Sequence, residues 1–218
     1  MRNYTVTLQG TRPLLMHQDN VSWDDQMASW KDDPKNKKYS KAGDDRSPAH
    51  RWLGSLYHDD THIGLPADNV MKAFMQGGAQ VPVPGGRNGK TFKAQSQSGL
   101  MIDQSHWPLL VGGKPIDVKP ILALENEPVF AAHQTAVERA GFKLDLRRVG
   151  VGGKKHVRVR PRFDTWTVTG TITVWDEQIT QAILQEIARY AGTYKGIGDW
   201  RPGGKTPGGF GLFTATVK

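Results

Sequence analysis

The densest run of positive charge in the sequence lies in the range 143–162, which holds a single acid, Asp145. Its cations are Lys143, Arg147, Arg148, Lys154, Lys155, Arg158, Arg160 and Arg162. The alternating pattern places Arg158, Arg160 and Arg162 on one face of a strand, with about 6.6 Å between successive side-chain stems. Guanidinium groups grip phosphate with two prongs, and a row of them follows a backbone without reading its bases. These residues predict a trough for a single strand of nucleic acid.

The same pattern has a second explanation, because solvated edge strands commonly carry charge that prevents aggregation. Gly150, Gly152 and Gly153 just upstream favour binding, since they indicate a flexible basic loop rather than a compact edge. We therefore predict a basic hairpin arm over 143–165, joined to the next strand by a bend or bulge near 161–164. The trough requires that the three arginines share one surface and are not paired with the protein's own carboxylates. If so, replacing all three abolishes binding.

The glycine-rich segment 196–211 is the second candidate site. Glycines let backbone N–H groups approach a ligand closely. Trp200 offers a stacking face, and Arg201 and Lys205 offer charge, a combination found in single-strand grooves. The alternative is an ordinary long turn in which Trp200 packs on the preceding helix. The Pro- and Gly-rich range 81–99 is predicted to be a loop that extends the groove with three cations, Arg87, Lys90 and Lys93.

The elements that must position these residues show a recognisable order. Periodicity and capping signals predict a strand, a helix, two strands, a helix, a strand, a helix and a strand, in the ranges 4–9, 66–76, 100–102, 118–124, 129–139, 165–174, 176–194 and 212–217. Taken as strand, helix, two strands, helix, strand, this order is the split βαβ pattern of ferredoxin-like domains. The predicted fold is an α+β, RRM-type antiparallel sheet backed by two helices. The chain reads as one domain, with an inserted lobe at 17–62.

Several of these segments resemble a known family. The helix followed by Gly196–Pro202 and Gly209–Gly211 before a closing strand resembles the RAMP superfamily, the RRM-fold proteins of CRISPR effector complexes. Over most of the chain, the sequence is also similar to a group of phage and prophage proteins, through Tyr4–His17, Leu65–Asn69 and the region from Arg158 to Phe213. The resemblance implies a strand-binding protein that forms homo-oligomers or filaments, such as a phage single-stranded DNA-binding protein or a guide-RNA backbone subunit.

Composition sets further bounds. The chain has 29 Lys and Arg against 21 Asp and Glu, a formal charge of +8, which favours a polyanionic partner. The absence of cysteine excludes disulfides and thiolate chemistry and is compatible with a reducing compartment, so we expect a cytoplasmic protein, in a bacterial host if it is phage-encoded. Neither a membrane span nor a cofactor is expected. The threonines at odd positions from Thr165 to Thr173 predict a hydroxyl-lined sheet face, on which base stacking is disfavoured.

Two other functions remain open. His17 and Asp24-Asp25, or the cluster His58, Asp59, Asp60 and His62, offer the groups of a nuclease or of a metal site. A polar turn between Tyr57 and Ile63 is the favoured interpretation of the cluster. The chain is thus expected not to be an enzyme. A phage assembly protein with no role in nucleic-acid binding is the second alternative.

Overall fold

The computed structural model describes residues 1–218, apart from the side chain of Val151. The fold is a mixed α+β arrangement in which the paired strands are antiparallel. β1 (Arg2–Gly10) lies between β10 (Phe213–Val217) and β9 (Thr167–Val174). The free edge of β9 pairs with β4 (Leu100–Ile102) and, farther along, with β5 (His106–Val111). The order β10–β1–β9–β4 therefore forms the centre of the main sheet, which the short strands β3 (Gly64–Pro66) and β6 (Lys114–Pro115) extend.

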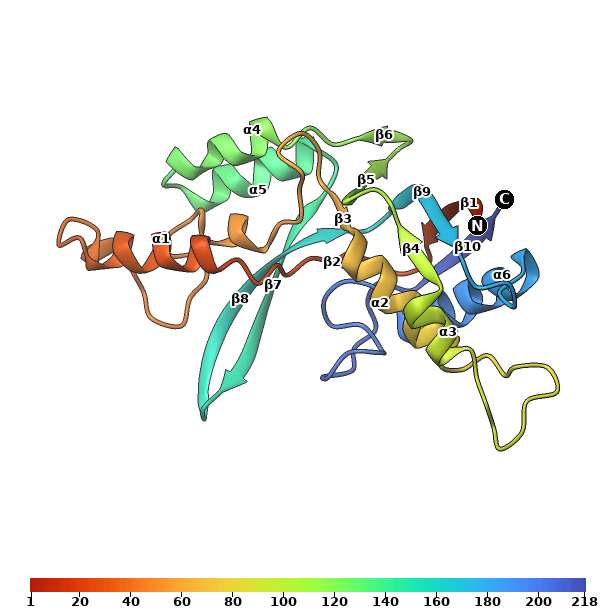
Figure 1. Ribbon diagram of the computed structural model, residues 1–218. Coiled ribbons are helices and arrows are strands. Elements are labelled where there is room, and N and C mark those ends of the chain that lie inside the picture. Colours follow the sequence, from red (N-terminus) through yellow and green to blue (C-terminus); the bar gives the residue numbers. More distant parts are fainter.

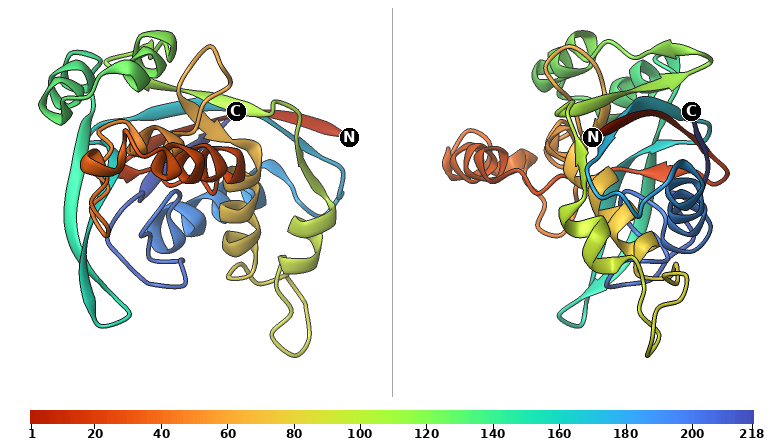
Figure 2. Two further views of the ribbon diagram at one scale, coloured as in Figure 1. Left: turned by 90° about the vertical axis from the view of Figure 1, so that its left-hand side faces the viewer. Right: turned by 45° about the vertical axis from the view of Figure 1, so that its right-hand side comes forward.

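One face of this sheet is covered by helices and the other carries hydroxyl groups. α2 (Ala67–Gly78), α3 (Lys93–Ser98) and α6 (Gln181–Tyr190) lie together on the covered side (Figure 2). Alternating residues of β1 and β9 point into that core, including Val6, Leu8, Val168 and Ile172, all with no exposed surface. On the opposite face the Thr7 and Thr169 hydroxyls lie 3.0 Å apart. The predicted threonine-lined face is confirmed for Thr167, Thr169 and Thr171, whereas Thr173 is buried and Thr165 precedes β9.

α2 includes Gly77 and Gly78 as its last two residues, two positions beyond the predicted end at residue 76. Both are buried where α2 meets other helices. A Cβ atom at Gly77 would lie 2.3 Å from the Ile187 carbonyl oxygen of α6, and one at Gly78 would lie 2.0 Å from Ser96 Oγ of α3. Glycine is needed here for close helix packing rather than for chain reversal.

Replacing Gly77 with alanine is expected to lower the free energy of unfolding by about 1–3 kcal/mol. The added methyl group overpacks the α2–α6 contact, and this cost exceeds the roughly 1 kcal/mol that alanine adds to helix propensity. Urea unfolding measures the change. Gly150→Ala is the control, because a Cβ atom there has nothing within 4 Å. Equal stability of both variants would contradict the packing argument.

A second sheet is built from the continuations of two strands of the first. β2 (Leu14–Leu15) follows β1, and β8 (Lys154–Phe163) precedes β9. β8 pairs with β2 and with β7 (Lys143–Val151), which forms the predicted hairpin (Figure 1). The predicted bend falls between β8 and β9, where the Trp166 indole N–H donates to the Arg12 carbonyl oxygen at 2.9 Å and packs over Gly10.

The segment 17–62 forms a lobe alongside this second sheet. It contains α1 (Val21–Asp32) and the 3₁₀ turns η1 (Lys37–Tyr39) and η2 (Arg51–Ser55). Backbone hydrogen bonds attach the lobe to the free edge of β8: Val157 N–H donates to the Gly43 carbonyl at 2.7 Å, and Asp45 N–H donates to the Val157 carbonyl at 3.0 Å. This attachment brings the lobe's acidic residues beside the arginines of β8.

Outside these strands the chain departs from several sequence-based predictions. The predicted strand 118–124 is helical instead, as α4 (Lys119–Leu122) and η3 (Ala123–Asn126), while α5 (Phe130–Arg139) is confirmed. The predicted loop 81–99 contains α3. α6 begins after Thr180, whose hydroxyl accepts from Ile183 N–H, rather than at Asp176, and it ends in the π-helical turn η4 (Ala191–Lys195).

Candidate nucleic-acid interface

β8 presents three of its cations on one face, as the alternation predicted. Arg158, Arg160 and Arg162 are partly exposed, while Val159, Pro161 and Phe163 point into the core. Cross-strand pairing places Arg147 opposite Arg158, Asp145 opposite Arg160 and Lys143 opposite Arg162. The three arginines, here called the arginine row, therefore share one surface with Arg147 and Asp145.

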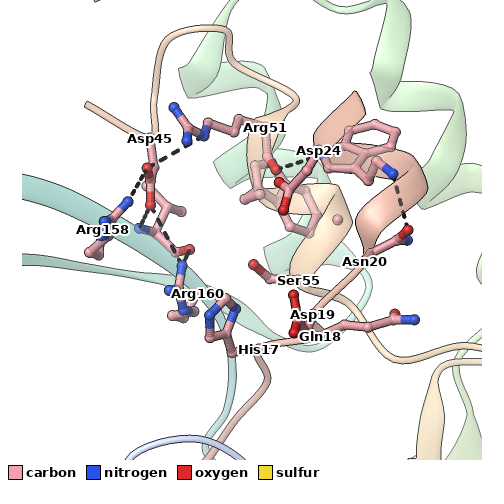
Figure 3. Close-up of a pocket in the computed structure, with 14 residues that line it drawn as sticks. His17, Gln18, Asp19, Asn20, Asp24, Asp45, Arg51, Ser55, Arg158 and Arg160 are labelled. Carbon is pink, nitrogen blue, oxygen red and sulfur yellow. Dashed lines mark hydrogen bonds and ion pairs between the residues drawn. The ribbon is translucent and has the colours of Figure 1, made fainter. Parts of the chain in front are cut away.

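The arginine row is nevertheless neutralised from within the protein. Asp45 of the lobe has 4% of its surface exposed and lies 3.1 Å from Arg158 Nη1 and 3.6 Å from Arg160 Nη1 (Figure 3). The same carboxylate approaches Arg51 at 3.6 Å and accepts from Val159 N–H at 3.4 Å. It is a buried anion surrounded by three guanidinium groups.

The rest of the row is paired in the same way. Arg160 also lies 3.4 Å from Asp199. Arg162 forms ion pairs with Asp164 at 2.7 Å and with Asp145 at 3.3 Å. Asp164 also forms an ion pair with Lys143 at 2.9 Å. The hydrogen bond from Lys143 and the second from Arg162 hold the pKa of Asp164 below its usual value, and Asp164 in turn raises the pKa of Arg162. The expectation of a row free of the protein's own carboxylates is wrong. Three of the four acids lie far from the row in sequence or on the opposite strand, so its spacing alone could not reveal them.

A cavity of about 520 Å³ opens between the arm and the glycine-rich loop. We call it the arm cavity. Its lining contains five permanent cations and two carboxylates, namely Arg147, Arg158, Arg160, Arg201 and Lys205, and Asp145 and Asp199. Leu15, Val149 and Trp200 supply apolar wall. The cavity thus combines a cationic surplus with an aromatic side chain, even after Asp45 behind the row is counted.

The glycine-rich loop is held against β2 by close backbone contacts. Gly198 has φ +82°, and a Cβ atom there would lie 2.5 Å from the Leu15 carbonyl oxygen. Asp199 N–H donates to that same carbonyl at 2.8 Å. A Cβ atom at Gly211 (φ +67°) would lie 1.8 Å from the Ile197 carbonyl oxygen. These glycines permit close approach within the protein and fix the loop beside the arm.

Trp200 faces the arm instead of packing on the preceding helix. Its ring stacks on Phe210 at 6.0 Å between centroids, and the Arg147 guanidinium lies 4.8 Å from both rings. Trp200 has φ +48°, a conformation that bulky residues rarely adopt. Such strain persists only where the surroundings enforce it, and it is often found at functional sites.

Arg201 lies beneath the same loop, buried and held by uncharged partners. Its Nη1 donates to Gln76 Oε1 at 2.7 Å and to the Lys195 carbonyl at 3.3 Å. Burial lowers the pKa of Arg201 below its usual value. Among the described side chains no carboxylate forms an ion pair with it. A buried cation of this kind favours an anion in the adjoining cavity.

A smaller cavity of about 260 Å³, which we call the lobe cavity, lies between the row and the lobe (Figure 3). It shares His17, Arg158 and Arg160 with the arm cavity. Its remaining polar lining comes from the lobe and includes Asp19, Asn20, Asp24, Arg51 and Ser55. The two cavities therefore adjoin across the same two arginines.

The other predicted cations stand apart from the row and differ in position. Lys154, Lys155 and Arg148 are exposed on the arm, and Lys205 is exposed at the rim of the arm cavity. Arg87 and Lys90 are exposed on a projection beyond α2, and Lys93 is exposed at the start of α3; none of the three is among the described residues that line either cavity. The structure thus brings Arg147, Arg158, Arg160, Trp200, Arg201 and Lys205 together and leaves the projection out.

The two groups of nuclease candidates lie in different places. His58 Nδ1 accepts from Asp60 N–H at 3.2 Å, and Asp59 accepts from Thr61 and His62 N–H, which describes a polar turn. His17 and Asp24, the latter in the first turn of α1, both line the lobe cavity.

Neither a protein-family model nor a curated protein matches this chain. Within the described part of the chain, no helix combines the length and apolar character that a bilayer crossing requires.

Proposed function

We propose that this protein binds single-stranded nucleic acid, with little dependence on sequence, in the arm cavity. The observation that carries the proposal is the cavity itself, a hollow of about 520 Å³ that places an aromatic ring and a surplus of cations between the arm and the loop. A base stacks on an aromatic face whatever its identity, while the cations receive the phosphates. Self-association along the strand is part of the same proposal.

The strand order supports a ferredoxin-like, RRM-type fold as the scaffold. The antiparallel order β10–β1–β9–β4, with α2 following β1 and α6 following β9, is the split βαβ arrangement. Because the exposed sheet face carries threonines rather than aromatic residues, the proposed strand runs through the arm cavity and not across the sheet.

The pairing of the arginine row changes how phosphate binds. A phosphate that contacts Arg158 or Arg160 has to compete with Asp45, so the row contributes less electrostatic affinity than free arginines would. The exposed cations without such partners, Lys154, Lys155 and Lys205, then account for most of the counterion release on binding.

The proposal is tested by fluorescence anisotropy with matched single-stranded DNA, single-stranded RNA and duplex at two salt concentrations. We expect both single strands to bind more tightly than the duplex and all binding to weaken as salt rises. Preference for the duplex would reject the arm cavity, which is a narrow hollow beside one aromatic ring.

Replacing Lys154, Lys155 and Lys205 with alanine is expected to reduce the slope of log K against log salt by about 2, since each phosphate contact on a single strand contributes roughly 0.7. The control removes the same charge elsewhere, with Lys72, Lys114 and Lys119 replaced by alanine; all three are exposed, and none belongs to the arm or lines the arm cavity. If both triple variants change the slope equally, only net charge matters and the assignment to the arm cavity fails.

A further inference from the structure

A groove with the opposite charge runs along the other side of the lobe. Two adjoining cavities of about 510 and 590 Å³ lie between α1 and the segment 125–128, and they share Trp30, His50, Glu125 and Asn126. We call this the acidic groove and define it by its aromatic and acidic side chains, Asp25, Trp30, Tyr39, His50, Glu125 and Glu127.

Three carboxylates of the acidic groove have no cationic partner among the described side chains. Asp25, Glu125 and Glu127 form no ion pair among the side chains that the structure describes, and the one lining cation, Arg46, is tied to Asp44 at 2.7 Å. The lobe, residues 17–62, carries nine acidic and seven basic residues, which leaves 22 Lys and Arg against 12 Asp and Glu in the rest of the chain. The lobe is thus an acidic region on a strongly basic protein.

The aromatic residues of the groove suit a cationic side chain. Trp30 and His50 pack at nearly a right angle, with 5.8 Å between ring centroids, and Trp30 and Glu125 line the same cavity. Tyr39 already carries Lys38 over its ring at 4.8 Å. A guanidinium group seated between an indole face and a carboxylate gains both cation–π attraction and a charge-assisted hydrogen bond.

The same protein carries such a side chain on a segment that lies far from the acidic groove. Residues 82–91 form a finger closed by hydrogen bonds between Val83 N–H and the Lys90 carbonyl, 2.9 Å, and between Phe92 N–H and the Val81 carbonyl, 2.9 Å. Buried Val81 and Phe92 anchor its base, while Arg87 and Lys90 are exposed at the tip. In Figure 1 the finger projects at lower right and α1 lies at far left, so the finger cannot reach the groove of its own chain.

We propose that the finger of one copy docks into the acidic groove of a second copy, with Arg87 between Trp30 and Glu125. The contact joins two different surfaces of the same chain, so it is heterologous and repeats from copy to copy. It does not depend on nucleic acid, and its failure would leave the proposed strand-binding function untouched.

Sedimentation velocity over a concentration series tests the contact, on protein freed of nucleic acid as judged by its absorbance ratio. We expect the parent chain to associate reversibly at low salt and to dissociate at high salt. Arg87→Glu and Glu125→Arg alone are each expected to weaken association by about tenfold or more, because each places like charges in contact. A monomeric parent at every concentration would overturn the proposal.

Mixing the two variants gives the decisive result. The finger of R87E and the groove of E125R carry opposite charges, and so do the finger of E125R and the groove of R87E. Association close to that of the parent is therefore expected only in the mixture. Arg148→Glu on the arm is the control for an equal change of charge and should associate like the parent. The contact would be refuted if R87E or E125R alone associated like the parent, or if their mixture stayed monomeric. Thermal unfolding confirms that each variant is folded.

Discussion

Replacing Asp45 with asparagine is expected to make the protein less stable and to make it bind single strands more tightly. The carboxylate contacts Arg51, Arg158 and Arg160 and is buried, whereas the arginines are partly exposed. Loss of a fully buried ion-pair partner costs about 3–5 kcal/mol, and exposure of the arginines reduces the expected cost to about 2–3 kcal/mol. Urea unfolding measures this change.

The gain in binding follows from the same contacts. Without Asp45, Arg158 and Arg160 no longer have to leave a carboxylate in order to meet a phosphate. Two additional phosphate contacts would steepen the slope of log K against log salt by up to about 1.4. Tighter binding at low salt and a steeper slope are therefore expected from anisotropy with a single-stranded oligonucleotide.

Asp44→Asn is the matched control, one residue away and with the same change of charge. Asp44 pairs with Arg46, which lines neither the arm cavity nor the lobe cavity. The Asp44→Asn variant should bind a single-stranded oligonucleotide with nearly the affinity of the parent. If D45N binds no more tightly than D44N, the arginine row does not face the strand and the proposed path is wrong.

The role of Asp45 also explains why replacing the whole arginine row is a poor test of binding. Arg158, Arg160 and Arg162 neutralise four carboxylates, of which Asp45 and Asp145 are largely buried. Removing the three arginines leaves Asp45 with Arg51 alone and Asp145 with Arg147 alone, so a loss of stability would accompany any loss of binding. The exposed lysines separate the two effects because they support no buried group.

The sequence predicted best what depends on local periodicity. The alternation in β1, β8 and β9 identified both the core residues and the shared face of Arg158, Arg160 and Arg162, because strand geometry fixes the face of every second residue. β5 has the same alternation, with Trp107 and Leu109 buried, but Pro108 lies between them. The sequence analysis therefore did not predict this strand.

Contacts between distant segments were not accessible in this way. Asp45 reaches Arg158 across 113 positions, and Gln76 reaches Arg201 across 125. The residues that neighbour Asp45 and Gln76 in the sequence give no indication of these partners. The role of two glycines could not be predicted from the sequence for a related reason. Gly77 and Gly198 look like turn residues, yet each is required because another element of the fold passes too close for a side chain.

Replacing Trp200 with alanine is expected to weaken binding to single strands by about 1–3 kcal/mol, the usual contribution of one stacked base. The indole is the aromatic wall of the arm cavity and also holds Arg147. Trp200→Phe keeps a stacking face and should retain most of the affinity. Neither variant relieves the strained backbone at φ +48°, since Phe and Ala both carry a Cβ atom.

Trp175→Ala provides the control for this prediction, since Trp175 is 56% exposed and lies outside both cavities. Anisotropy at one salt concentration ranks the variants, and the expected order of affinity is the parent and W175A together, then W200F, then W200A. The ranking isolates stacking from charge, because all four proteins carry the same number of ionic groups. W200A binding as tightly as W175A would show that no base stacks in the arm cavity, and the strand would then have to lie on the exposed lysines alone.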